Sequence, residues 1–282
     1  MNGLRVGKSE VYERDMATLK QYREDHFRIT LHKVIRRAGY ESIDGESGKG
    51  KKNTAGNLGK LEESLSRTKS TIFELALCNP WEWFVTLTLN PEYHDRSDLN
   101  TYKKKLSTWI KNYNRLHDTK IKYLLIPEQH QDKTTWHMHG LIMGLPEGHL
   151  KEFKEEERLP IAILIELKKG NQIYNWDAYQ QKFGYITISK IRNAESVSKY
   201  ITKYITKDLA ETRIALNDHL YYCSQGLKRA EKLYQGQLTR ELDEDYSNEY
   251  VKIKMVRTFD EAISYFVDES GKRGRYKQRE LL

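Results

Sequence analysis

The stretch that decides the fold is Trp136-His137-Met138-His139-Gly140-Leu141-Ile142-Met143-Gly144, residues 136–144 of a 282-residue chain. It is rich in apolar residues and contains glycine, a pattern typical of a β-strand that ends in a turn. Successive side chains of a strand point to opposite faces, so His137 and His139 would share one face while Met138 lies on the other. Two imidazoles placed in this way can share one divalent cation, although a pair standing alone could equally be a polar face that meets only solvent.

A second strand-like run, IKYLLIPEQH at residues 121–130, comes immediately before. The short polar segment between the runs, QDKTT, favours an antiparallel hairpin, which would bring Glu128 near the histidines. A carboxylate added to two imidazoles makes a mixed oxygen and nitrogen site suited to Mg²⁺ or Mn²⁺. His130 is the alternative third ligand, since strand parity puts it on the same face, and three histidines would favour softer transition metals.

The third informative segment runs from about residue 193 to residue 213 without glycine or proline, and its apolar residues recur at helical spacing. Tyr200 and Tyr204 are four residues apart, as are Lys199, Lys203 and Lys207, so each set would form a stripe along one helix. A phenol has an unperturbed pKa of about 10, so nearby positive charge or a base must help it act as a nucleophile. The structural alternative is an ordinary amphipathic helix with boundary tyrosines and solvated lysines.

Taken together, these segments resemble the HUH endonucleases that initiate rolling-circle replication of phages and small plasmids. That family carries three motifs in a fixed order. Phe84-Val85-Thr86-Leu87-Thr88-Leu89 resembles the first, a central strand that shapes the site floor, and His137-Met138-His139 resembles the second, which holds the metal. The doubled Tyr-x-x-Lys resembles the third motif in its two-tyrosine form. The resemblance covers roughly residues 65 to 210.

The resemblance implies metal-dependent nicking and rejoining of single-stranded DNA at a replication origin. One tyrosine would attack the scissile phosphate, leaving a 5′-phosphotyrosyl link and a free 3′-hydroxyl, and the second would cut again after a round of synthesis. The implied site residues are Tyr200 and Tyr204 as nucleophiles, Lys203 and Lys207 as electrostatic helpers, and His137, His139 and Glu128 as metal ligands. The order in which the tyrosines act does not follow from the sequence.

The order of the elements predicts an α+β fold, with a central antiparallel sheet of four to five strands and flanking helices in a split β-α-β ferredoxin-like layout. We expect an N-terminal charged helical segment and glycine-rich linker at residues 1–60, the endonuclease domain at 61–213, and an extension with a basic tail at 214–282. Scattered apolar positions in residues 8–38 favour one or two helices there.

Composition agrees with a nucleic-acid partner. The 48 Lys and Arg exceed the 40 Asp and Glu by eight, which predicts a positive field attractive to phosphate. Residues 101–120 interleave six Lys or Arg with Tyr102, Trp109 and Tyr113. Helical spacing favours packing of these aromatic side chains on the sheet, while the lysines could follow a DNA backbone.

Other features bound the context. The chain has no apolar run long enough to span a bilayer, and only two cysteines, so we expect a cytoplasmic protein of a bacterial host. The sequence offers no credible nucleotide-binding loop, so host helicase and polymerase are the expected partners. The oligomeric state does not follow from the sequence.

Three alternative functions stay open. A conjugative relaxase or a transposase would use related chemistry, but relaxases usually place the tyrosine before the histidines, and single-tyrosine transposases lack the second tyrosine. A noncatalytic, basic nucleic-acid-binding protein would bind without metal and form no adduct. A metal-dependent phosphodiesterase that uses water would tolerate Tyr-to-Phe changes at both positions.

Overall fold

The structure, a computed structural model, describes residues 11–12, 15–33, 36–37, 58–130, 133–206, 209, 219–248 and 250–267. The chain divides into two compact units. Unit 1 combines residues 1–53 with residues 229–282, and unit 2 comprises residues 54–228. None of the helices in the described ranges combines the length and apolar character that a bilayer crossing requires.

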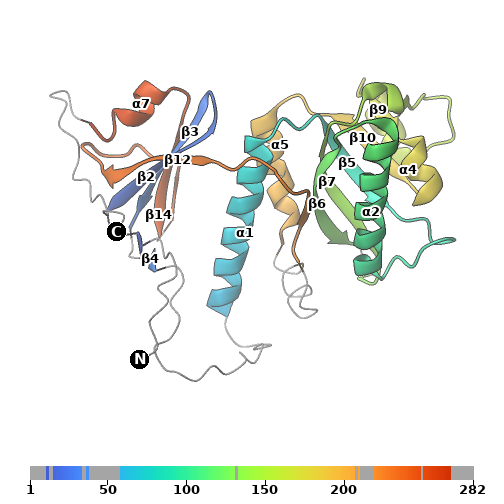
Figure 1. The fold of residues 1–282 in the computed structure, drawn as a ribbon, viewed down its shortest axis with the longest axis horizontal. Helices are drawn as coiled ribbons and strands as arrows, with labels where there is room; N and C mark the ends of the chain where they lie inside the picture. The colour runs from blue at the N-terminus through green and yellow to red at the C-terminus, as the bar shows by residue number, and fades with distance from the viewer. Residues whose placement is uncertain are drawn as a thin grey trace. The chain divides into compact units, whose positions relative to one another are not determined.

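Unit 2 is built on a seven-stranded antiparallel sheet with strand order β11-β6-β7-β5-β10-β9-β8. Its strands are β5 (Trp83–Thr88), β6 (Lys122–Gln129), β7 (Trp136–Met143), β8 (Lys151–Glu152), β9 (Ile173–Asn175), β10 (Ile186–Lys190) and β11 (Tyr222–Cys223). Its helices are α1 (Leu58–Cys78), α2 (Leu99–His117), α3 (Ile161–Lys168), α4 (Asp177–Lys182) and α5 (Ala194–Ile201), with 3₁₀ turns η1 (Glu147–His149) and η2 (Thr202–Tyr204). Helices flank the sheet, with α1 and α5 on one side and α2 and α4 on the other (Figure 1).

The predicted α+β class and central antiparallel sheet are confirmed. The sheet is wider than the expected four to five strands because the short strands β8, β9 and β11 extend its edges. The predicted hairpin is present as β6 and β7, which pair from Lys122↔Met143 to Gln129↔Trp136. The first-motif strand, β5, lies between β7 and β10.

Alternation along β5 separates the two faces of the sheet. Trp83, Val85 and Leu87 are buried, whereas Phe84 and Thr86 are half-buried on the opposite face. Helix α2 covers the face of its buried residues Leu99, Tyr102, Leu106, Ile110 and Tyr113. Because Tyr102 and Tyr113 are buried and Trp109 packs on Trp176 at a centroid distance of 4.9 Å, the aromatic side chains of residues 101–120 belong to the core and do not stack on bases.

Unit 1 contains a five-stranded antiparallel sheet with order β12-β2-β3-β14-β13. Its elements are β2 (Met16–Arg23), β3 (His26–His32), β12 (Glu231–Gln237), β13 (Tyr246–Ser247), β14 (Val251–Val256) and α7 (Phe259–Ile263). The short strands β1 (Val11–Tyr12) and β4 (Arg36–Arg37) pair separately.

The N-terminal segment differs from the sequence-based expectation. The predicted helical segment within residues 1–60 contains the hairpin β2–β3, whose buried Ala17, Leu19, Phe27 and Ile29 alternate with polar residues at the period of a strand. The segment 214–282 is also not a separate extension, since β11 joins the sheet of unit 2 and β12 pairs with β2. The basic tail at 268–282 and residues 38–57, which hold most of the glycine-rich linker, lie outside the described residues.

Candidate active site

Three side chains converge on the face of the unit 2 sheet that α2 does not cover. The Oε2 atom of Glu128 lies 2.8 Å from Nε2 of His137 and 2.7 Å from Nε2 of His139, and the two imidazole nitrogens are 2.8 Å apart. The β6–β7 register explains this, since Glu128 lies directly opposite His137. Among the described residues, these three form the one group of histidine, cysteine and acidic side chains that could hold a metal ion.

The histidine side chains are about 12–13% exposed, and that of Glu128 is 42% exposed. Burial, reinforced by the neighbouring His137, lowers the pKa of His139 from 6.5 to about 4. His139 is therefore a neutral imidazole near pH 7, the form that can donate a lone pair to a cation. Its Nδ1 lies 3.1 Å from the Thr86 hydroxyl on β5, which can accept the Nδ1 proton and leave Nε2 free to bind.

His130, the alternative third ligand, occupies a different position. Its Nε2 lies 3.2 Å from Nδ1 of His137 and 2.6 Å from Nη2 of Arg96. An arginine can only donate hydrogen bonds, so Nε2 of His130 is an acceptor in this arrangement. His130 and Arg96 therefore support His137 from behind and do not complete the converging group.

The tyrosine segment is less regular than the predicted helix over residues 193–213. Asn193 caps α5 by accepting a hydrogen bond from the Ser196 backbone, but the α-helix ends at Ile201 and continues as the 3₁₀ turn η2. Four of the six residues 201–206 are β-branched, which disfavours α-helix, and Ile205 is buried in the core. This turn carries Tyr204 onto the sheet.

Both tyrosines lie beside the histidines. The Tyr204 ring stacks on His139, with centroids 4.0 Å apart and planes at 16°. The Tyr200 ring meets Phe84 edge-on at 5.5 Å. The two hydroxyl oxygens are 3.0 Å apart, within hydrogen-bonding distance, so the phenols form one polar centre next to the Glu128 and histidine group.

The tyrosines differ in environment. Tyr200 is 44% exposed, whereas Tyr204 is half-buried. Burial, the hydrogen bond to Tyr200 and the negative charge of Glu128 all raise the pKa of Tyr204 above its usual value of 10. The Tyr204 phenol therefore keeps its proton near pH 7 unless positive charge is brought close to it.

The lysines of the predicted stripe have different partners. The Nζ of Lys203 lies 5.3 Å from the centroid of the Tyr200 ring, close enough for a cation–π contact. Lys199 instead forms an ion pair with Glu195 at 2.8 Å. Lys207 lies outside the described residues.

Sequence reasoning missed Arg96 and the supporting role of His130. Arg96 lies in the segment between β5 and α2, where no periodic pattern marks a position as facing the site. Its link to His130 depends on a contact across 34 residues. A strand pattern alone indicates only that His130 shares the parity of Glu128.

Comparison with protein families identifies this same region. Residues 82–209 match the family model described as Replication-associated protein ORF2/gene 2 protein. The match begins next to β5 and ends beyond Tyr204, so it contains every described residue of the candidate site. No curated protein and no solved structure matches the chain. The family match indicates a role in the initiation of replication.

Proposed function

We propose that unit 2 nicks and rejoins single-stranded DNA at a replication origin through a 5′-phosphotyrosyl intermediate, and so starts rolling-circle replication. The observation that carries this proposal is the stacking of Tyr204 on His139, within a converging Glu128, His137 and His139 group. A potential nucleophile next to a metal-type donor set, in a segment that matches a replication-associated family, favours phosphodiester chemistry over simple binding.

The donor set suits a divalent cation. Two neutral imidazole nitrogens and one carboxylate oxygen would bind Mg²⁺ or Mn²⁺ and leave positions open for phosphate oxygens. The short distances within the group support this fit, because three lone-pair donors at 2.7–2.8 Å from one another are not stable without a proton or a cation between them. A cation held there would withdraw charge from a nonbridging oxygen of the scissile phosphate.

The residues of the chain supply the remaining steps. A tyrosine oxygen forms a bond to phosphorus as the bond from phosphorus to the 3′ oxygen breaks, and the departing oxygen takes up a proton to become the 3′-hydroxyl. The proton of the attacking phenol must leave, which becomes easier once the charge of Glu128 is compensated, since that charge helps to raise the pKa of Tyr204.

Two adjacent phenols fit a cycle of two cuts. With hydroxyls 3.0 Å apart, one tyrosine can hold the 5′ end while the other attacks a second phosphate at the same place. The released 3′-hydroxyl then attacks the first phosphotyrosine and closes a circle. Lys203, beside the Tyr200 ring, would stabilise a developing phenolate, and we assign the same role to Lys207 on the strength of the Tyr-x-x-Lys repeat.

The partners follow from this chemistry. The substrate would be a single strand at the origin, the 3′-hydroxyl would be extended by a host polymerase, and a host helicase would separate the strands. The cytoplasm of a bacterial cell is the setting in which we place these steps.

An adduct assay tests the proposal. Single-stranded oligonucleotides that tile the replicon, labelled at the 3′ end, are incubated with the full chain and Mn²⁺ and resolved on a denaturing gel. The 5′-phosphotyrosyl link keeps the 3′-labelled fragment on the protein, whereas a 5′ label would report a shortened free strand. We expect an adduct that disappears in EDTA.

The variants identify the nucleophile. Tyr200→Phe and Tyr204→Phe should each leave some adduct, and the double variant should leave none. Tyr185→Phe is the matched control, because Tyr185 is 63% exposed in the same unit and lies outside the site. Cleavage that survives the double change would establish water as the nucleophile, and binding without cleavage on every oligonucleotide would establish a noncatalytic protein.

A further inference from the structure

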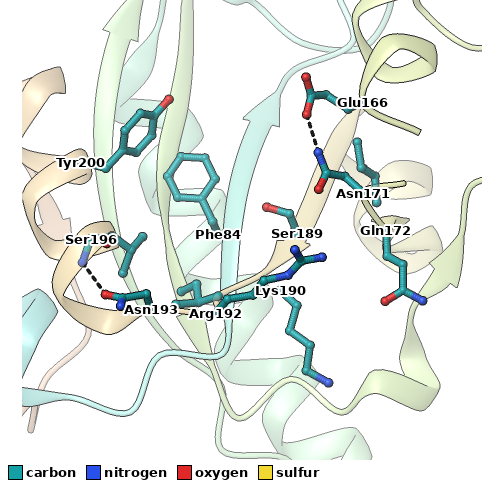
Figure 2. Close-up of a pocket in the computed structure, with 13 residues that line it drawn as sticks. Phe84, Glu166, Asn171, Gln172, Ser189, Lys190, Arg192, Asn193, Ser196 and Tyr200 are labelled. Carbon is teal, nitrogen blue, oxygen red and sulfur yellow. Dashed lines mark hydrogen bonds between the residues drawn. The ribbon is translucent and has the colours of Figure 1, made fainter. Parts of the chain in front are cut away.

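A cleft of about 610 Å³ opens beside Tyr200 on the same face of the unit 2 sheet (Figure 2). Phe84 and Tyr200 line it on the side of the candidate active site, and the Phe84 ring also stacks on His139 at 6.2 Å. The cleft therefore adjoins the place where the scissile phosphate would lie. Its volume is within the range of roughly 300–1,000 Å³ typical of sites for small organic groups.

The floor of the cleft is apolar and partly aromatic. Phe84, Ile173, Ile191 and Val197 supply it, from β5, β9, the end of β10 and α5. Sheet register fixes Phe84 in this position, because Phe84 pairs with Ser189 and both side chains point to this face. An aromatic ring among aliphatic side chains provides a surface on which a flat ring can stack.

Polar groups surround this floor. No hydrogen bond or ion pair within the described part of the chain engages the side chains of Gln172, Ser189 or Arg192, all of which line the cleft. In the view of Figure 2 the guanidinium of Arg192 lies near Ser189, on the side toward Gln172. These groups can donate and accept hydrogen bonds at the edge of a bound ring.

The charges at the cleft favour an anionic strand. The one carboxylate in its lining, Glu166, is already engaged by Lys169 at 2.6 Å and by Asn171 at 2.8 Å. Lys190 extends to Glu147 on the opposite face, so Arg192 is the cation available at the cleft among the described residues that line it. A phosphate that flanks a bound ring could therefore pair with Arg192.

We propose that this cleft receives one unpaired nucleobase of the substrate strand, next to the phosphate that the tyrosines attack. This rests on the proposed function, which puts that phosphate beside Tyr200. A flat aromatic ring with polar edges, attached to an anionic backbone, matches the apolar floor, the uncommitted polar groups and the arginine together. The edge of a paired base is occupied by its complement, so only a single strand can present a base here.

Binding in EDTA tests the proposal without catalysis. The full chain is titrated into two labelled probes of roughly 12 nucleotides, a random-sequence pool and an oligomer of abasic residues with the same number of phosphates, and fluorescence anisotropy gives both affinities. The wild type should bind the base-bearing pool roughly tenfold or more tightly than the abasic oligomer, as expected for a stacked base.

Two pairs of variants locate the base-dependent part of the affinity. Ser196→Trp fills the cleft from α5, and Ser70→Trp on the exposed surface of α1 is its control. Gln172→Ala removes a polar edge group, and Gln181→Ala on exposed α4 is its control. The cleft variants should lose most of the preference for bases and keep wild-type affinity for the abasic oligomer, while the controls keep both.

The inference is overturned if Ser196→Trp, folded as judged by its melting temperature, keeps the full preference for the base-bearing pool. It is also overturned if the wild type binds both probes equally. The adduct assay separates this result from the proposed function, since an adduct formed without a base preference would refute the cleft alone. A preference that depends on the cleft, without any adduct, would refute the nicking chemistry and leave the base site standing.

Discussion

The close approach of β7 to β6 at Gly140 makes a sharp test of how the histidine strand is held. A Cβ added at Gly140 would lie 2.4 Å from the Leu124 carbonyl oxygen and 2.4 Å from Cδ2 of Leu125, whereas ordinary contacts begin near 3.4 Å. Gly140→Ala must therefore push the strands apart by about 1 Å at this point, because the carbonyl belongs to the backbone of β6 and cannot rotate away.

Overpacking of this kind costs about 3 kcal/mol, the upper part of the usual range, since backbone must move. For a unit of this size, that cost corresponds to a fall in melting temperature of roughly 6–12 °C. Thermal unfolding followed by circular dichroism measures it. Because His139 precedes Gly140 on the strand, the rise in melting temperature that Mn²⁺ gives the wild type should also shrink.

Gly148→Ala is the matched control, because a Cβ there would have nothing within 4 Å. It should melt like the wild type and keep the response to Mn²⁺. A Gly140→Ala protein that melts within about a degree of this control would refute the close packing of β6 on β7, and with it the register that brings Glu128 opposite His137.

The remaining predictions concern the support of the site and the frame around it. Arg96→Ala removes the donor that holds the imidazole behind His137, so Mn²⁺ affinity by calorimetry should fall roughly tenfold or more; an unchanged affinity would show that this contact does not orient the ligand. In EDTA the wild type should lose about 3 kcal/mol of unfolding free energy between pH 6.5 and 4, because the unfolded chain binds the His139 proton more tightly than the folded chain; urea titrations should show a flatter profile for His139→Gln. Asn79→Ala removes buried hydrogen bonds to Leu75 and to both backbone groups of Lys228, and should cost about 1–3 kcal/mol by urea unfolding with no change in Mn²⁺ affinity.

Sequence patterns predicted the convergence of Glu128, His137 and His139 because a strand has a strict period of two. Once the hairpin is assigned, parity alone places the three side chains on one face. The third dimension did not follow in this way. The stacking of Tyr204 on His139 depends on where α5 ends, and that end is set by the burial of Ile205.

The N-terminal segment shows why local patterns fail when the partner is distant. Leu19 and Ile29 follow the period of a strand, but the neighbours that make the strands stable come from residues 231–256. Charged residues between the apolar positions made a helix an equally good local solution. The cleft beside Tyr200 is likewise invisible to pattern analysis, because its lining comes from several separate elements.

The pairing of β2 with β12 and of β3 with β14 means that unit 1 is made from both ends of the chain, with unit 2 as a continuous insertion. During synthesis the ribosome completes unit 2 before it has made half of the sheet of unit 1. Unit 2 can therefore fold on the nascent chain, while β2 and β3 must wait as an unpartnered hairpin until β12 and β14 emerge. A premature stop codon after residue 228 would leave the candidate active site whole and abolish unit 1.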